Sequence, residues 1–282
     1  MRGFACILAA LFLLAPGAAV RGDSPDGEPP KLALIVDDFG YFYDDTVRGF
    51  LAVDASLTMS VIPGLPFSER IAGEIRGAEK GLLAHLPMEP IDYPEKDPGP
   101  DALFTNQSDA EIRARVRRAL DSFHRLDGAN NHMGSRAMQD RRLVRIVMEE
   151  IGDRNLFFLD SKTVACRVGR RTAAAAGVPC LENDLFWDTG YSTREEIAEG
   201  LDRLARVALE RGFAVGIGHP RPVTLEVLRE KLPELEALGI RLVPLAELIH
   251  GQRIAARNAA PNEGGGGSDH RGAAAAAAAV VR

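Results

Sequence analysis

Short apolar runs alternate with amphipathic stretches from Lys31 to about His250, and the pattern repeats about eight times. Each run has roughly the length of a β-strand. The runs are Leu32 to Val36, Leu57 to Ile62, Gly81 to Leu86, Gly128 to Met133, Asn155 to Leu159, Pro179 to Leu181, Phe213 to Ile217 and Ile240 to Val243. Stretches between them, such as Ser108 to Arg125 and Arg194 to Arg211, place apolar residues at helical spacing. Strands and helices in alternation predict a parallel sheet with right-handed crossovers.

One uninterrupted series of such units favours a single α/β domain over residues 31 to 250, a distorted (β/α)7-8 TIM-like barrel. An open doubly wound sheet is the alternative, and its first turn should carry a glycine-rich phosphate fingerprint. Here the first strand runs into Asp37 and Asp38, two carboxylates that would repel a phosphate. The sequence therefore favours the barrel.

The segments outside this series have a different composition. Arg2, the apolar stretch up to Leu14 and the small residues to Ala19 follow the order of a secretory signal peptide, so we expect residues 1–20 to be removed. The apolar run is too short to span a bilayer, and no other segment is long enough. Residues 21–30 are expected to form a linker, and residues 251–282, with their glycine and alanine runs, a low-complexity disordered tail. The expected location is secreted, and periplasmic in a Gram-negative source, with no membrane span after cleavage.

Composition narrows the class of protein further. The 282 residues are 46% hydrophobic and 26% charged, close to a soluble globular average. The formal net charge is -6, and the basic residues are scattered rather than gathered into one block. We therefore expect no nucleic-acid partner.

Polar and ionisable residues gather where the predicted strands end, which is where barrel active sites are assembled. They are Asp37 and Asp38, His85 and Glu89, Asn131, His132 and Arg136, Asp160 and Ser161, Glu182, Asp184 and Asp188, and His219. A lone aspartate at a strand end commonly caps the next helix, and we favour that interpretation for Asp160 and Asp188. Two adjacent carboxylates repel each other unless a cation or a shared proton relieves the repulsion, which favours a functional role for Asp37 and Asp38.

Histidine placement points to a metal. Of six histidines, His85, His132 and His219 lie at or near the ends of different strands. Imidazole nitrogen and carboxylate oxygen are ligands of zinc, which keeps an open position when it is catalytic. The sequence thus predicts a divalent metal, with Zn²⁺ as the first candidate, beside the aspartate pair.

Five motifs in this order, VDDFG, HLPMEP, NNHMGSR, LDSKT and GIGHP, resemble the divergent polysaccharide deacetylase family of secreted bacterial proteins. The resemblance covers residues 31 to 250. It implies a distorted barrel related to carbohydrate esterases that remove acetyl groups from N-acetylated sugars.

The resemblance also implies roles for single residues. It makes Asp37 the base, Asp38 a metal ligand, His85 a metal-binding histidine and His219 the general acid. The position of the second metal-binding histidine holds Glu89, and NNHMGSR stands where an Arg-Pro-Pro segment is expected. Three options follow: His132 completes the metal site, Glu89 does, or the metal is absent.

The resulting hypothesis is a metal-dependent hydrolase that removes acetyl groups from N- or O-acetylated carbohydrate, such as an envelope polysaccharide or a peptidoglycan-type glycan. Its metal ligands would be Asp38, His85 and His132, and its catalytic groups would be Asp37 and His219. Glu89, Asp160 and Asp184 are candidates for a further ligand or an orienting group. The substrate contacts would be Asn131, Arg136 and Ser161. Asp160 or Asp184 would orient His219. One alternative keeps the fold but lacks catalysis, binding glycan or organising the envelope. Another is a metal-dependent hydrolase of a different amide, ester or phosphoester.

The segment from Pro87 to Asn106 is rich in Pro, Asp and Gly. Loops of this length are commonly lids or binding loops, and Tyr93, Phe104 and Trp187 could form a wall on which sugars stack. An ordinary solvated insertion is the equal alternative.

Overall fold

The computed structural model describes residues 28–251; the expected signal peptide, linker residues 21–27 and tail residues 252–282 lie outside the described residues. The strands are β1 (Lys31–Phe39), β2 (Leu57–Val61), β3 (Gly81–Met88), β4 (Gly128–Met133), β5 (Phe157–Asp160), β6 (Cys180–Glu182), β7 (Leu185–Phe186), β8 (Phe213–Gly218) and β9 (Arg241–Leu242). The helices are α1 (Asp45–Leu51), α2 (Ser68–Gly77), α3 (Asp109–Asp121), the 3-10 turn η1 (Ala137–Gln139), α4 (Arg141–Gly152), α5 (Val168–Ala176), α6 (Arg194–Arg211) and α7 (Pro222–Ala237). Residues 245–251 are helical as well.

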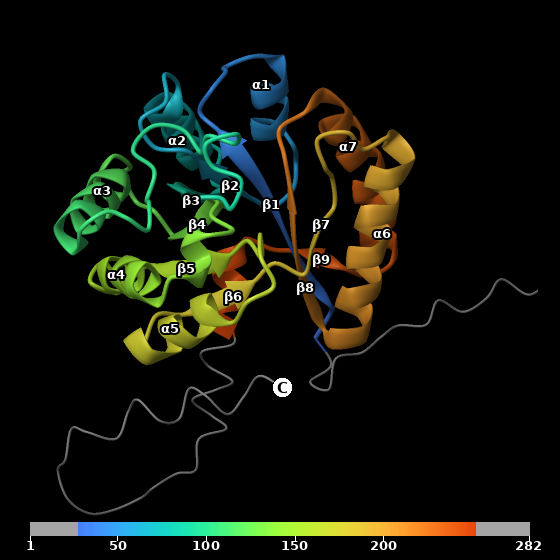
Figure 1. Ribbon diagram of the computed structural model, residues 1–282. Helices are drawn as coiled ribbons and strands as arrows, with labels where there is room; N and C mark the ends of the chain where they lie inside the picture. The colour runs from blue at the N-terminus through green and yellow to red at the C-terminus, as the bar shows by residue number, and fades with distance from the viewer. Residues whose placement is uncertain (1–27, 252–282) are drawn as a thin grey trace, which may run out of the picture.

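The strands form one curled parallel sheet surrounded by helices (Figure 1). Their order is β6-β5-β4-β3-β2-β1-β8-β7, with β9 beside the start of β1. The backbone N–H of Asn183 donates to Asp160 in β5, and that of Asp184 donates to Val215 in β8. The segment 180–186 therefore leaves β5 and joins β8 midway, so that β6 and β7 act as one interrupted strand. This arrangement is the distorted barrel that the sequence predicts.

The core has two parts, because successive side chains of each strand lie on opposite faces of the sheet. In β1, Leu32 and Leu34 pack with the outer core that includes residues of the surrounding helices. Ala33 and Ile35 belong to a second cluster with Val215 from β8. Because successive side chains of a strand point to opposite faces, the second cluster fills the inside of the barrel.

The amino-terminal end of the barrel is closed by apolar residues of the last helical turns. Leu245, Leu248 and Ile249 are buried in the same interior cluster. The backbone N–H of Leu245 donates to the hydroxyl of Thr58 near the start of β2, at 3.0 Å. Apolar side chains thus fill the amino-terminal end of the barrel, and the polar pocket described below lies at the carboxyl-terminal end.

The predicted elements agree well with the structure. Every predicted apolar run overlaps a strand, and β4 and α6 have the predicted bounds. Both long predicted helices begin with a capping box, formed by Ser108 with Glu111 and by Thr193 with Glu196. Strand β7 was not predicted. Among the helices between residues 28 and 251, none combines the length and the apolar character that crossing a membrane needs.

Candidate functional site

The aspartate pair owes its position to an irregularity in β1. The register between β1 and β2 shifts between Val36 and Phe39, and Asp38 has a φ of 63°, in the left-handed region. In a regular strand, adjacent side chains would point to opposite faces, whereas a bulge of this kind redirects one of them. Asp37 and Asp38 consequently line the same pocket at the mouth of the barrel.

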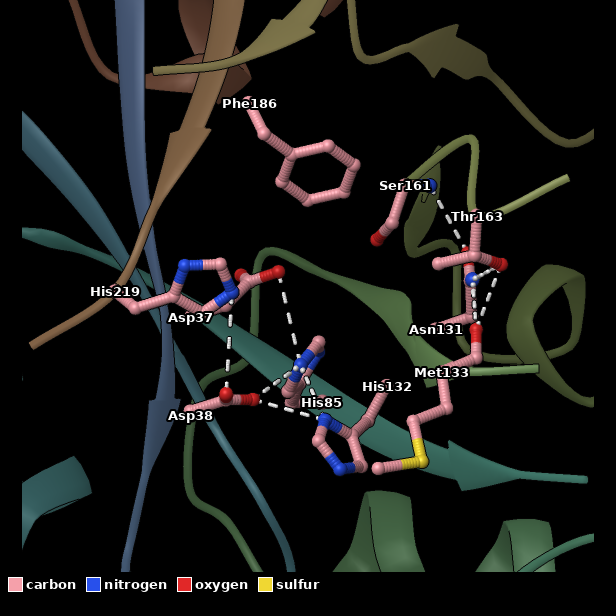
Figure 2. Close-up of a pocket in the computed structure, with 10 residues that line it drawn as sticks. All are labelled: Asp37, Asp38, His85, Asn131, His132, Met133, Ser161, Thr163, Phe186 and His219. Atoms are coloured by element: carbon pink, nitrogen blue, oxygen red, sulfur yellow. Dashed lines mark hydrogen bonds and ion pairs between the residues drawn. The ribbon is translucent and has the colours of Figure 1, made fainter. Parts of the chain in front are cut away.

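Three side chains from three strands meet at this mouth (Figure 2). Oδ1 of Asp38 lies 3.1 Å from Nε2 of His85 and 2.8 Å from Nδ1 of His132, and the two nitrogens are 3.2 Å apart. Ligand atoms held about 2.0 to 2.2 Å from one zinc ion are separated by roughly 3 Å. The described residues thus contain a donor set of one carboxylate and two imidazoles whose spacing suits a single divalent ion, and it uses His132 rather than Glu89.

The charges around these donors favour a cation. Burial opposes the ionisation of Asp38, but hydrogen bonds with His132 and His85 outweigh it and hold the pKa of Asp38 well below its usual range. Burial also disfavours a charged His85, yet the carboxylates of Asp37 and Asp38 raise the pKa of this histidine. A field that stabilises a proton on His85 also stabilises a metal ion at the same point.

Asn130 joins Asp37 to His85. Its Nδ2 donates to both oxygens of Asp37, at 2.9 and 3.0 Å, and its Oδ1 lies 2.8 Å from Nδ1 of His85. Asn130 is fully buried, and Asp37 and His85 are each 2% exposed. Sequence reasoning missed Asn130, although it lies two residues before His132 and therefore on the same side of β4.

His219 lies across the pocket, at the end of β8. Its Nδ1 is 2.7 Å from Oδ1 of Asp188, and its Nε2 is 3.9 Å from Oδ2 of Asp38. The second oxygen of Asp188 accepts from the backbone N–H of His219 at 3.0 Å and from the Thr224 hydroxyl at 2.6 Å. Burial alone would lower the pKa of His219, but the hydrogen bond with Asp188 and the charge of Asp38 raise it. The ring of Phe186 stacks on His219, with ring planes 12° apart.

The residue that orients His219 is therefore Asp188, and the expectation that Asp160 or Asp184 does so is wrong. Asp184 accepts from Arg211 at 2.9 Å and from the backbone N–H of Val215, which ties it to the start of β8. Asp188 was expected to cap a helix, and its contacts with His219 show another role.

Asp160 faces its own loop. It accepts from the backbone N–H of Lys162 at 2.9 Å, and a Cβ on Gly169, in the first turn of α5, would come 2.5 Å from its other oxygen. Burial raises the pKa of Asp160. Asp160 therefore holds its own loop and does not reach His219. The expectation that it caps the next helix is wrong, because the N-cap residue of α5 is Arg167 and no side chain caps that helix.

Glu89 and Arg136 lie outside the pocket. Oε2 of Glu89 accepts from the backbone N–H and the hydroxyl of Thr105, both at 2.7 Å, and its Oε1 is 3.5 Å from Arg136. Arg136 also donates to the backbone oxygen of Ile91. Glu89 thus holds the long loop after β3 against the turn after β4, and the structure does not bring Arg136 to the expected substrate contacts.

The pocket has a volume of about 250 Å³. It is lined by Asp37, Asp38, His85, Asn131, His132, Met133, Ser161, Thr163, Phe186 and His219. Asn131 and Ser161 are present as expected, but the Asn131 amide already donates to Met133 and Thr163. Trp187, expected in a sugar-stacking wall, is 1% exposed and packs against Gly218. That expectation was wrong for Trp187, while Tyr93 is 43% exposed and contacts Phe104 edge to face.

Comparison with known proteins agrees with this geometry. The sequence profile described as "Divergent polysaccharide deacetylase" matches residues 34–249. The chain belongs to this family. The expected resemblance is thereby confirmed.

Two relatives of this deacetylase-family chain are uncharacterised bacterial proteins. One, from Haemophilus influenzae, is 30% identical over 224 residues, which cover 79% of this chain and 78% of the relative. The other, YibQ of Escherichia coli, is 30% identical over 237 residues, covering 82% and 72%. The crystal structure of the uncharacterised protein ATU2773 from Agrobacterium tumefaciens superposes with a TM-score of 0.74 at 24% identity, covering 80% of this chain and 97% of that one. This likeness supports the shared fold.

Proposed function

We propose that this member of the divergent polysaccharide deacetylase family is a secreted, metal-dependent hydrolase. It removes acetyl groups from N- or O-acetylated carbohydrate, and its metal is zinc. The observation that carries the proposal is the convergence of Asp38, His85 and His132 at 2.8 to 3.2 Å, in a pocket that also holds Asp37 and His219. The proposed periplasmic location rests on the amino-terminal sequence, which lies outside the described residues.

The donor set suits hydrolysis because it leaves part of the coordination sphere to water or substrate. A zinc ion held there would lower the pKa of a water molecule and stabilise the negative charge that develops on the acetyl oxygen. Asp37 is the group that would accept a proton beside the donor set: its carboxylate is buried, and its Oδ2 lies 3.6 Å from Nε2 of His85. General base catalysis requires such a group within reach of the attacking water.

His219 supplies the proton that the departing amine or alcohol requires. Asp188 receives its Nδ1–H, so Nε2 faces the pocket and can carry the transferred proton. The raised pKa of His219 keeps a larger fraction of it protonated near neutral pH. The two proton-transfer groups thus lie in one pocket, as sequential protonation steps require.

The proposed substrate class follows from the size and lining of the pocket. A volume of about 250 Å³ suits an acetyl group with the sugar ring that carries it. Met133 and Phe186 provide apolar surface for the acetyl methyl, while Ser161 and Thr163 offer hydroxyl groups to the sugar.

Metal content and acetate release test this proposal together. Protein loaded with zinc, nickel or cobalt should bind one equivalent and release acetate from acetylated chitooligosaccharides or peptidoglycan fragments. Asp38→Ala should abolish metal uptake, whereas Asp37→Asn should keep the metal and lose turnover. Glu89→Gln is the matched control, because Glu89 contacts Thr105 and Arg136, and it should bind metal normally.

Two outcomes would contradict the proposal. Stoichiometric metal binding by Asp38→Ala would show that the ligand set is wrong. Wild-type protein that binds metal but hydrolyses no acetyl ester, N-acetyl sugar or phosphodiester would favour the glycan-binding alternative without catalysis.

A further inference from the structure

We propose that Asn130 is a positioning residue that fixes the tautomer of His85 and the orientation of Asp37 with one side-chain amide. This inference rests on the proposed function, since it concerns how the metal ligand and the base are prepared for their roles. Asn130 is neither one of the three donor residues nor a lining residue of the pocket, and it acts through Asp37 and His85, which it contacts.

The hydrogen bonds determine which way the Asn130 amide points. An ionised carboxylate only accepts hydrogen bonds, so the group that lies 2.9 and 3.0 Å from the two oxygens of Asp37 must be the amide nitrogen. The amide oxygen then faces Nδ1 of His85 at 2.8 Å. A reversed amide would place oxygen against two carboxylate oxygens, which repel it.

This orientation dictates the proton position on neutral His85. The amide oxygen of Asn130 can only accept, so Nδ1 of His85 must carry the hydrogen. Nε2 is then unprotonated and presents its lone pair to Asp38 and His132, 3.1 and 3.2 Å away. A metal ligand needs this lone pair, and the histidine nitrogen that does not bind metal commonly donates to an acceptor of this kind.

Without Asn130, the neighbouring charge would favour the wrong tautomer. Oδ1 of Asp38 lies 3.1 Å from Nε2 of His85 and would accept a hydrogen from it. That hydrogen would occupy the direction in which a metal must bind. Asn130 opposes this arrangement, and because Asn130, Asp37 and His85 are all at most 2% exposed, bulk water cannot readily replace its hydrogen bonds.

The side chain of Asn130 combines a donor and an acceptor, and two substitutions separate them. Asn130→Asp keeps an acceptor for Nδ1 of His85 but removes the donor to Asp37. Asn130→Leu has similar volume and removes both. If the inference is correct, the two variants should differ in metal affinity although both lose the contact with Asp37.

The test measures zinc affinity by competition with a chelating dye, alongside acetate release. Asn130→Leu should weaken zinc binding about 10- to 100-fold, the usual effect of losing the partner of a metal-bound histidine. Asn130→Asp should keep zinc affinity within about 3-fold while kcat falls, because the second carboxylate beside Asp37 disturbs the base. Asn183→Leu is the matched control: Asn183 is another buried asparagine, its amide donates to the backbone of Ser161, and zinc affinity should not change.

A second readout needs neither zinc nor turnover. Nitrogen-15 NMR of the metal-free wild type, at a pH where His85 is neutral, should show Nδ1 protonated and Nε2 unprotonated. Asn130→Leu should lose this preference.

The outcomes separate this inference from the proposed function. Wild-type zinc binding without acetate release would contradict the enzyme but leave the role of Asn130 in place. A wild-type His85 protonated at Nε2, or Asn130→Leu with wild-type zinc affinity, would overturn the inference. Equal loss of zinc affinity in Asn130→Leu and Asn130→Asp would also overturn it, since a structural role alone would then explain both.

Discussion

Replacing Asp188 by Asn should move the alkaline limb of the pH–rate profile to lower pH. A general acid must be protonated, so the rate falls as pH rises through the pKa of His219. Asp188 raises that pKa through a hydrogen bond at 2.7 Å and through its negative charge. Asparagine has nearly the same shape without the charge, so the pKa of His219 should fall and activity should be lost at a lower pH.

The size of the shift can be bounded from the geometry. Two unit charges about 4 Å apart interact by about 4 kcal/mol at an effective dielectric constant of about 20. His219 has a side chain that is 20% exposed, and the charge of Asp38 remains after the substitution. Solvent screening and this remaining charge reduce the expected loss of stabilisation of protonated His219 to about 1 to 3 kcal/mol.

The assay is acetate release from an acetylated chitooligosaccharide between pH 5 and 10, approximately the window in which histidine and its perturbed forms titrate. Asp184→Asn is the matched control, because Asp184 lies on the same segment but pairs with Arg211. It should leave the alkaline limb in place. An unchanged limb in folded Asp188→Asn protein, or an equal shift in Asp184→Asn, would refute this account of His219.

Three further predictions concern stability. Gly218→Ala should lower the free energy of unfolding by about 1 to 3 kcal/mol in urea titrations, because the new Cβ would lie 2.4 Å from the Trp187 ring. The control Gly73→Ala in α2, where an added Cβ would meet nothing within 4 Å, should be neutral or stabilising. Equal losses of stability in the two variants would contradict the packing argument. The folded-state pKa values of His85 and His219 are raised, so the two protonated histidines should contribute fully to the stability of metal-free protein below about pH 6.5, and this contribution should be lost as pH rises through the folded values. If chemical denaturation showed that the stability of metal-free protein rises over this pH range, the assignment would be contradicted. Zinc at 100 times its dissociation constant should add about 2.7 kcal/mol to the free energy of unfolding, and chelation should remove it, as calorimetry can measure.

The fold was largely predictable because the longer strands, β1 to β5 and β8, keep a buried run of the right length. Strand β4 and helix α6 have the predicted bounds, since β4 begins at Gly128 and α6 ends directly before Gly212. Strand β7 was missed because its two residues carry no alternation of their own. Only the tertiary structure shows that the segment 180–186 changes partner from β5 to β8.

The donor set was predictable because parallel strands deliver their last residues to one end. That rule brings Asp38, His85 and His132 to one end, whereas the family resemblance assigned Asp38 and His85 and left His132 and Glu89 as alternatives. The orienting aspartate did not follow, because Asp184 and Asp188 lie four positions apart on one irregular segment, and the path of the backbone decides which of them reaches His219.

Asn130 escaped prediction for a related reason. Asn130 is an uncharged residue of β4 beside the predicted Asn131 and His132, and only the register with β3 places it directly opposite His85. Counting back two residues from His132 along the same side of the strand would have found it.

The left-handed backbone at Asp38 has a consequence for protein engineering. Transplanting the VDDFG sequence onto a regular strand would send its two acids to opposite sides of the host sheet and produce no shared binding space. A successful graft must therefore import the kink and the neighbouring loop. That loop includes Gly40, whose φ is 130° and where an added Cβ would come 2.9 Å from Oγ of Ser68 and 3.0 Å from Cδ1 of Leu65. The backbone conformation of this segment must therefore be transferred together with the five residues of the motif.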